Sequence, residues 1–263
     1  MKRRLWAAVV LALFTGGCVT EYNLATQQEE RLIYGTEKEE KIGAAVAAKI
    51  EEHMPLVEEQ DVNQRLERIL RRIVAVCDRK DIVYTIKAID TDRINAVSLP
   101  GGYIYVYRGL LGLVENDDQL AGVIAHEVGH ITAKHGLKRQ QAAYGALFLQ
   151  MLSLGARDAR VAQGVNTAIN SLFMQHSQEA EFEADRLSVK YLRKAGYDLR
   201  QIVIFLRRME EEKDKGPIRP YSYWKTHPNM AQRRAMVNKE ITGRLEFKDY
   251  IQLIDRPNGG LKF

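Results

Sequence analysis

Apolar residues recur at three- and four-residue spacing along much of this chain, which is the periodicity of an amphipathic helix. The pattern is clear at 37–52 and 62–77. Two segments that follow, 82–89 and 95–107, are instead rich in β-branched and aromatic residues and predict strands. From there to about residue 240 the helical pattern returns almost without interruption. We therefore expect an α+β fold that is mainly α, with a small β-sheet ahead of a long helical region.

Two stretches of the helical region allow more than one interpretation. Residues 141–156 are rich in Ala, Leu and Phe but include Gln150, so we expect a buried helix rather than a membrane contact. Residues 155–175 have small side chains and few residues that mark the start or end of a helix or strand. Such a segment suits either a mobile flap or a plain connecting helix.

The helix predicted at 118–134 contains the sequence HEVGH. Residues four apart lie on one face of a helix, so His126 and His130 can both point at a single Zn²⁺. Glu127 lies about 100° round the helix from His126, which suits a carboxylate that reaches a metal-bound water rather than the metal. The motif alone also fits a surface helix with two solvated histidines, but its spacing indicates a zinc hydrolase with Glu127 as general base.

A catalytic zinc site usually has three protein ligands and one open position, so a third ligand must lie elsewhere. His135 comes five residues after the second motif histidine and would lie off the ligand face, so we expect it to be solvated or to cap the helix. Glu181 is the better candidate, and Asp185, one helical turn later, could accept the N–H of a ligating imidazole. We expect Glu179 and Glu183 on a solvated, charged face.

Four sequence elements together resemble a known family. They are HEVGH, EFEAD at 181–185, NAVSLPGGYIYV at 95–106, and Thr226-His227-Pro228 with Arg233 six residues after the histidine. In this order they resemble the HtpX-like and CAAX-prenyl-protease zinc metallopeptidases, metallopeptidase family 48. The elements span about half of the chain, and the resemblance is strongest for the periplasmic, BepA-like lipoprotein branch.

The resemblance implies a gluzincin-like fold that holds one Zn²⁺ per chain through His126, His130 and Glu181. It implies that Glu127 is the general base. Asp185 matches an aspartate that acts either as a proton donor or as support for a ligand. We favour support, because an aspartate one turn from a ligand is well placed to orient an imidazole.

The resemblance also implies that His227 and Arg233 face the active-site cleft. His227 would either fill the open zinc position and keep the enzyme latent, which we favour, or donate to the oxyanion. The strand beginning at Tyr103 would lie at the edge of the sheet, where Gly102, Tyr103 and Tyr105 would contact an extended peptide. These tyrosines could equally serve only to pack the strand.

The N-terminal residues predict the cellular location. Positive side chains at 2–4 precede an apolar run at 5–14 and then Thr15-Gly16-Gly17-Cys18, a pattern typical of a lipoprotein signal peptide. An uncleaved anchor is the alternative. We expect a mature protein lipidated at Cys18 that faces the periplasm, attached to the outer membrane as the resemblance implies.

Charge and cysteine usage agree with this location. The formal net charge of +5 includes the three positive side chains at 2–4, which leaves about +2 for the mature chain and does not indicate nucleic-acid binding. Apart from the lipidated cysteine only Cys77 remains, so the mature chain cannot form an internal disulfide. We predict a signal peptide at 1–17, a polar tether at 18–35 and one metallopeptidase domain at 36–263.

The expected function is that of a zinc endopeptidase acting on unfolded or misassembled cell-envelope proteins. The competing hypothesis is a periplasmic chaperone or assembly factor for outer-membrane proteins, which uses the cleft mainly to hold its clients. A metal-dependent hydrolase of a non-peptide bond is a third hypothesis, and the predicted substrate strand argues against it.

Overall fold

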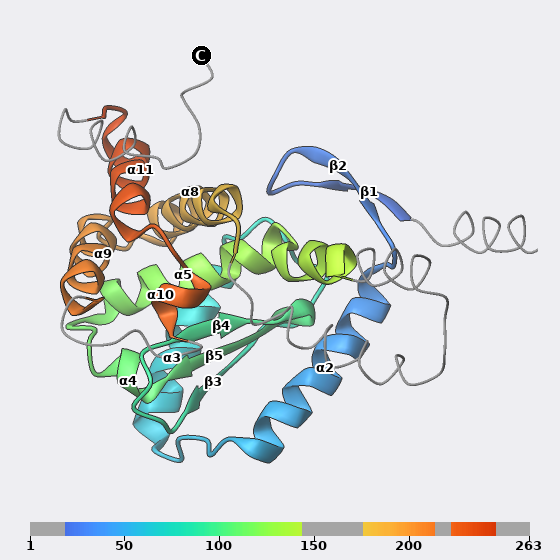
Figure 1. Ribbon diagram of the computed structural model, residues 1–263, viewed down its shortest axis with the longest axis horizontal. Coiled ribbons are helices and arrows are strands. Elements are labelled where there is room, and N and C mark those ends of the chain that lie inside the picture. The colour runs from blue at the N-terminus through green and yellow to red at the C-terminus, as the bar shows by residue number, and fades with distance from the viewer. Residues whose placement is uncertain (1–18, 144–175, 214–221, 246–263) are drawn as a thin grey trace, which may run out of the picture.

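The computed structural model describes residues 19–143, 176–213 and 222–245 (Figure 1). The predicted mainly helical α+β fold is confirmed. In chain order the elements are β1 (Val19–Asn23), β2 (Gln28–Leu32), α2 (Thr36–His53), α3 (Gln60–Val74), β3 (Thr85–Ile89), β4 (Ala96–Ser98), the 3-10 turn η1 (Pro100–Gly102), β5 (Tyr103–Tyr107), α4 (Arg108–Leu111), α5 (Asp117–Thr132), α8 (Gln178–Ala195), α9 (Arg200–Lys213), α10 (Tyr223–Thr226) and α11 (Met230–Thr242).

The larger sheet has the strand order β3-β5-β4. β5 pairs in parallel with β3 and antiparallel with β4, so it is the central strand and β4 lies at an edge. The expectation that the strand at Tyr103–Tyr107 forms the edge is therefore wrong. The predicted strand at 95–107 is divided by η1, where Gly101 and Gly102 adopt φ of 78° and 95° and fold the chain back on itself. A Cβ at Gly102 would lie 2.3 Å from the carbonyl oxygen of Val83, so only glycine fits there.

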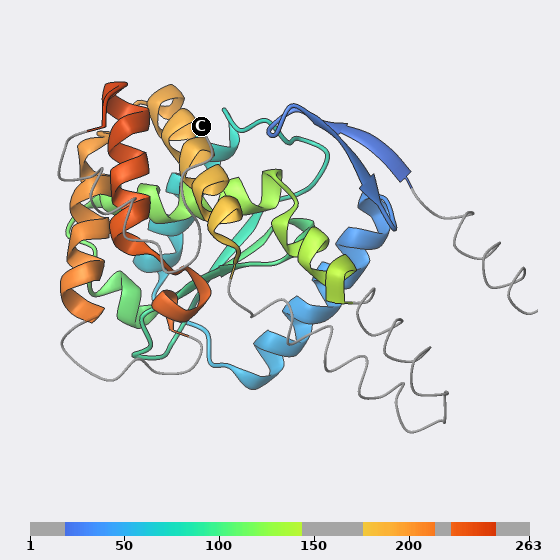
Figure 2. The ribbon, with the colours of Figure 1, turned by 45° about the horizontal axis from the view of Figure 1, so that its top comes forward.

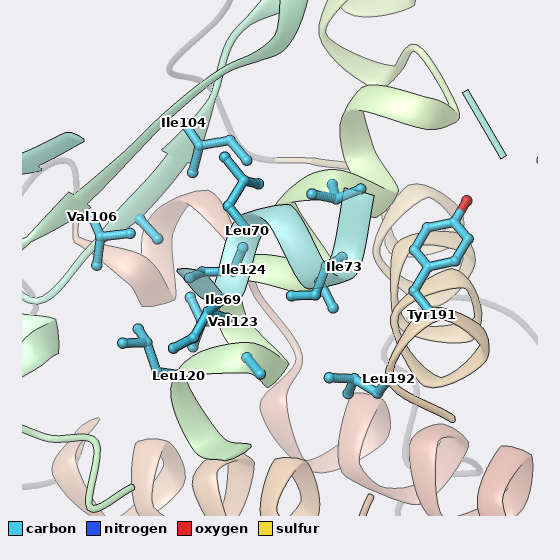
Figure 3. Close-up of a cluster of buried hydrophobic side chains, with 14 of the residues drawn as sticks. Ile69, Leu70, Ile73, Ile104, Val106, Leu120, Val123, Ile124, Tyr191 and Leu192 are labelled. Carbon is cyan, nitrogen blue, oxygen red and sulfur yellow. The ribbon is translucent and has the colours of Figure 1, made fainter. Parts of the chain in front are cut away.

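The two faces of this sheet pack against different helices, because successive side chains of a strand point to opposite sides. Ile104 and Val106 of β5 join the main core with residues of α3 and α5, as Figure 3 shows. Tyr105 and Tyr107 belong instead to a second cluster with apolar residues of α2. The sheet thus supports α5 on one face and is covered by α2 on the other.

Helices α8, α9 and α11 cover the side of α5 that faces away from the sheet (Figures 1 and 2). Tyr191 and Leu192 of α8 and Phe205 of α9 are buried in the main core. Burying an apolar side chain of this size contributes roughly 1.5–3 kcal/mol. With partners on both sides, every residue of α5 from Gln119 to Thr132 is buried.

Residues 19–32 do not form the predicted tether. They form an antiparallel hairpin, with Val19 paired to Leu32 and Asn23 to Gln28. Leu32 is buried, and the side-chain amide of Asn23 donates a 3.0 Å hydrogen bond to the carbonyl oxygen of Thr132 at the end of α5. The hairpin therefore packs on the helical part of the molecule, beside the end of α5 (Figure 1).

The predicted helices at 37–52, 62–77 and 118–134 are confirmed as α2, α3 and α5, with small shifts at their ends. Asn116 caps α5 by accepting a hydrogen bond from the backbone N–H of Gln119. The expectations for residues 141–156 and 155–175 lie outside the described residues, except for 141–143, which are helical. In the part of the chain that the structure describes, no helix is both long and apolar enough to cross a membrane.

Candidate metal centre

The site is built where α5 and α8 run close together. Gly129 of α5 makes this approach possible, because a Cβ there would lie 2.8 Å from the carbonyl oxygen of Ala184 on α8. The contact places the α5 motif beside the acidic end of α8. It brings together His126, His130 and Glu181, which are all buried.

The ligand atoms of these three side chains lie at the separations that a small cation requires. The two imidazole Nε2 atoms are 3.0 Å apart, and the Glu181 oxygens lie 3.3 Å from His130 Nε2 and 3.5 Å from His126 Nε2. A tetrahedral zinc with ligands at about 2.0–2.1 Å has about 3.3 Å between neighbouring ligand atoms. Together with His227, all the ligand atoms fall within 4.8 Å of one another.

The polar groups of this cluster also indicate a missing partner. Both carboxylate oxygens of Glu127 and of Glu181, and Nε2 of His227, are buried without a well-aligned hydrogen bond, although Glu127 Oε1 lies 3.3 Å from His227 Nε2 and Glu181 Oε2 lies 3.0 Å from Arg233 Nη1. Unpaired buried polar groups cost stability, and a bound cation would satisfy them. Burial is the largest cause that holds the pKa of His130 well below its usual value. The imidazole is therefore neutral, as a metal ligand must be, and the nitrogen and oxygen donors fit a metal of the zinc type.

Asp185 and Arg233 fix the orientation of His126. Asp185 Oδ1 lies 2.8 Å from His126 Nδ1, which leaves Nε2 of that ring directed at the ligand cluster. Arg233 donates to both Asp185 oxygens, at 2.9 Å and 2.8 Å, and its Nη1 lies 3.0 Å from Glu181 Oε2. Burial raises the pKa of Asp185, but the guanidinium outweighs that effect and lowers it. Arg233 thus lies in the site, where its contacts are to carboxylates that surround the metal position.

Glu127 and His227 face each other on the other side of the cluster. His227 Nε2 is 3.3 Å from Glu127 Oε1. Burial raises the pKa of Glu127, whereas the nearby His227 and His126 lower it, and the net shift is downward. The carboxylate is therefore ionised, which a general base requires. The His227 ring stacks on Tyr223 at 4.4 Å, and its Nδ1 lies 2.8 Å from the Thr226 hydroxyl.

The residues expected to contact a peptide lie mostly elsewhere. Tyr105 is buried against α2, and its hydroxyl donates a 2.8 Å hydrogen bond to Glu51. Tyr103 packs against the same cluster, and Gly102 is buried in η1. The strand that does reach the site is β4, where Ser98 lies close enough to the Glu127 carboxylate to help lower its pKa. In the sequence, the only indication that Ser98 belongs to the site is its position in the 95–106 element, between Asn95 and the glycine turn.

Three further residues adjoin the cluster that sequence reasoning did not place there. His135, expected to be solvated, is only 7% exposed, and its Nδ1 lies 2.8 Å from Nδ1 of His130. Glu183, expected on a solvated face, is half-buried and lies 3.1 Å from His135 Nε2. The ring of His176 stacks on that of His130 at 3.8 Å. Of these three residues, only His135 had a sequence signal for the site, namely its position five residues after His130. In a continuous helix that position lies off the ligand face, so the sequence argued against a contact.

Comparison with known proteins agrees with this geometry. The model of peptidase family M48 matches residues 60–241, which is more than half of the chain. The beta-barrel assembly-enhancing protease of Escherichia coli (strain K12) is 24% identical over 246 residues, which cover 87% of this chain and 50% of that protein. The mitochondrial metalloendopeptidase OMA1 of Schizosaccharomyces pombe is 27% identical over 169 residues, covering 64% of this chain and 50% of that protein. The chain spans about half the length of these curated relatives. On the family match, this chain belongs to peptidase family M48.

Proposed function

We propose that this chain is a zinc-dependent endopeptidase that cleaves unfolded or misassembled proteins of the cell envelope. The observation that carries the proposal is the buried cluster of His126, His130 and Glu181 with the ionised Glu127 beside it. The printed names of the relatives, a beta-barrel assembly-enhancing protease and metalloendopeptidases, support a protein substrate. The first of these names also supports the envelope as the place of action.

In this mechanism His126, His130 and Glu181 hold the zinc. When bound, zinc supplies a Lewis acid that polarises the scissile carbonyl and acidifies a water molecule. The Glu127 carboxylate takes a proton from the attacking water as the water oxygen bonds to the carbonyl carbon. The same carboxyl group then gives that proton to the leaving nitrogen as the C–N bond breaks. Asp185 and Arg233 hold the first imidazole in place throughout.

Among the described residues no strand pairs with the outer edge of β4, and this edge supports an extended substrate. Backbone hydrogen bonds join Tyr107 N–H to Asn95 O at 3.0 Å and Leu99 N–H to Tyr103 O at 2.8 Å. Antiparallel pairing alternates, so the backbone of Ser98 faces the open edge. A peptide that added there would pair through its own backbone, close to Glu127. An unfolded segment offers an extended, unpaired backbone along its whole length for this pairing, and this supports unfolded clients for the site.

Cleavage of one substrate in two states tests this function. The zinc-loaded protein is incubated with an outer-membrane β-barrel protein, either unfolded in urea-diluted buffer or folded in detergent micelles. We expect fragments only from the unfolded form, and none after the zinc is removed with a chelator. Suppressed aggregation of the unfolded protein without any fragments would favour the chaperone function, because β4 can hold a strand without cutting it.

His227 is proposed as a gate that fills the open zinc position in the resting enzyme. The Thr226 hydroxyl donates to Asn95 Oδ1 at 3.2 Å, so its oxygen is free to accept the Nδ1–H of His227. A neutral imidazole held in this way presents the lone pair of Nε2 to the ligand cluster. That arrangement suits a metal ligand better than a donor to an oxyanion.

His227→Ala is therefore expected to raise basal proteolysis, by roughly tenfold if the closed state is about 90% populated. The measurement is the initial rate of casein cleavage by equal amounts of zinc-loaded variant and parent. A fall of about 100-fold would instead assign His227 to oxyanion stabilisation. Equal rates would remove His227 from the active site.

We also propose that a lipid at Cys18 attaches the mature chain to the outer membrane. The proposal is supported by the positive residues at 2–4, the apolar run at 5–14 and the small residues before Cys18. Cys18→Ser is expected to leave an unlipidated precursor that keeps residues 1–17. Intact-mass measurement of the membrane-extracted protein checks this. A parent protein without acyl chains at Cys18 would contradict the proposal.

A further inference from the structure

The chain changes direction directly after the metal-binding helix. α5 ends at Thr132, Lys134 adopts a left-handed φ of 56°, and the chain is helical again from His135. In one continuous helix His135 would lie about 140° round from His130 and could not meet it. The break instead brings Nδ1 of His135 to 2.8 Å from Nδ1 of His130.

Contacts with the β1–β2 hairpin hold this break in place. A left-handed conformation costs a non-glycine residue roughly 1–2 kcal/mol, so something must maintain it. Lys134 is buried, and its ammonium group lies 2.7 Å from the carboxylate of Glu21 on β1. Asn23 donates to the carbonyl oxygen of Thr132 at 3.0 Å. The position of His135 is thus fixed from outside the helix that it follows.

The hydrogen bonds between His130 and His135 and between His135 and Glu183 can run in only one direction when a metal is bound. A neutral imidazole whose Nε2 binds a metal has its proton on Nδ1, so His130 donates to His135 Nδ1. His135 then has its own proton on Nε2, which lies 3.1 Å from Glu183 Oε2. The ionised carboxylate of Glu183 can only accept. The proton positions of all three groups are therefore set by the metal at one end and the carboxylate at the other.

We propose that His135 and Glu183 are positioning residues for the metal ligand His130, an inference that rests on the metal site of the proposed function. Asp185 orients His126 by direct contact with its Nδ1. Glu183 orients His130 in the same way, but through the imidazole of His135, which lies between them. α8 supplies the metal ligand Glu181 as well as both carboxylates that support the histidines. The tautomer and ring orientation of each ligating histidine are then fixed by the same helix.

A second metal is the competing interpretation, because the ligand atoms of His130, His135 and His176 lie within 4.8 Å of one another. The geometry favours the hydrogen-bonded chain. His130 would have to lose its Nδ1 proton to bind a second cation while its Nε2 binds the first. The ring of His176 also stacks on His130, at an interplanar angle of 26°, and so meets it with its face.

The test compares two substitutions of similar size at His135. His135→Leu removes the acceptor for His130, whereas His135→Asn keeps a side-chain oxygen near the place of Nδ1. We expect His135→Leu to weaken zinc binding by about 10–100-fold in a chelator competition assay, as the loss of an outer-sphere partner typically does. His135→Asn is expected to stay within a few-fold of the parent. The visible spectrum of the cobalt-substituted protein should shift for His135→Leu and remain parent-like for His135→Asn.

Glu183 provides the second comparison, with a control on the same helix. Glu183→Gln keeps an oxygen that accepts from His135 and should bind zinc nearly as the parent does, whereas Glu183→Leu should weaken binding. The control is Glu179→Gln, on an exposed position of α8, which should leave zinc binding unchanged. Far-ultraviolet circular dichroism and thermal unfolding of the metal-free proteins show whether each variant folds.

The outcomes separate this inference from the proposed function. Equal zinc affinity in the folded His135→Leu, His135→Asn and parent proteins would overturn the positioning role and leave the peptidase intact. Two zinc ions per parent chain, with one lost in His135→Asn, would overturn it in favour of a second metal site. A parent that binds zinc tightly but cleaves no unfolded protein would overturn the peptidase and leave the positioning role standing.

Discussion

Replacing Glu127 with glutamine is expected to lower cleavage of an unfolded protein by at least about 100-fold, because an amide cannot accept the proton of the attacking water. Zinc content should stay at one ion per chain, since Glu127 is not among the three proposed ligands. Glutamine has nearly the same shape, so it should fit the buried position beside His227. The measurement is the initial cleavage rate of casein at matched zinc occupancy.

The control for this variant is Glu52→Gln, which makes the same chemical change on the exposed side of α2, where the Glu52 side chain is 75% exposed. It should leave the rate unchanged. A Glu127→Gln protein that keeps its zinc and cleaves at the parent rate would remove Glu127 as the general base. If that variant cleaves nothing but still rescues an envelope defect in cells, holding rather than cutting is the function that matters there.

Glu181→Ala should lose the metal, and all cleavage with it. The carboxylate oxygens lie 3.3 Å and 3.5 Å from the two ligating imidazole nitrogens, so their removal leaves only His126 and His130 on the zinc. We expect zinc affinity to fall by more than the roughly 10–100-fold typical of losing an outer-sphere partner. Mass-spectrometric metal analysis after dialysis against a chelator measures this. His130→Ala is expected to give the same result.

A folding control is needed for this variant, because Glu181 also lies 3.0 Å from the buried Arg233. Arg233 keeps its two hydrogen bonds to Asp185, so the metal-free variant should still unfold cooperatively. Full zinc occupancy in folded Glu181→Ala protein would defeat the assignment of the third ligand.

The sequence alone was sufficient for the parts of the site that depend on helical spacing. Residues four apart share a helical face whatever surrounds the helix, so His126 and His130 had to point the same way. The same rule relates Glu181 to Asp185, which proved to contact His126 at 2.8 Å. The amphipathic patterns of α2, α3 and α5 were equally local and gave those helices to within a few residues.

Only the tertiary structure decided how these elements meet. Tyr105 was expected in an edge strand, but pairing with both β3 and β4 makes its strand central. The residues of one strand do not determine which other segments pair with it. His135 was expected off the ligand face, which is true of a continuous helix. At the break that reverses this, Lys134 contacts Glu21, which lies 113 residues away in the sequence. Local spacing fixes which side chains share a face, whereas long-range ion pairs and close backbone approach fix where that face points.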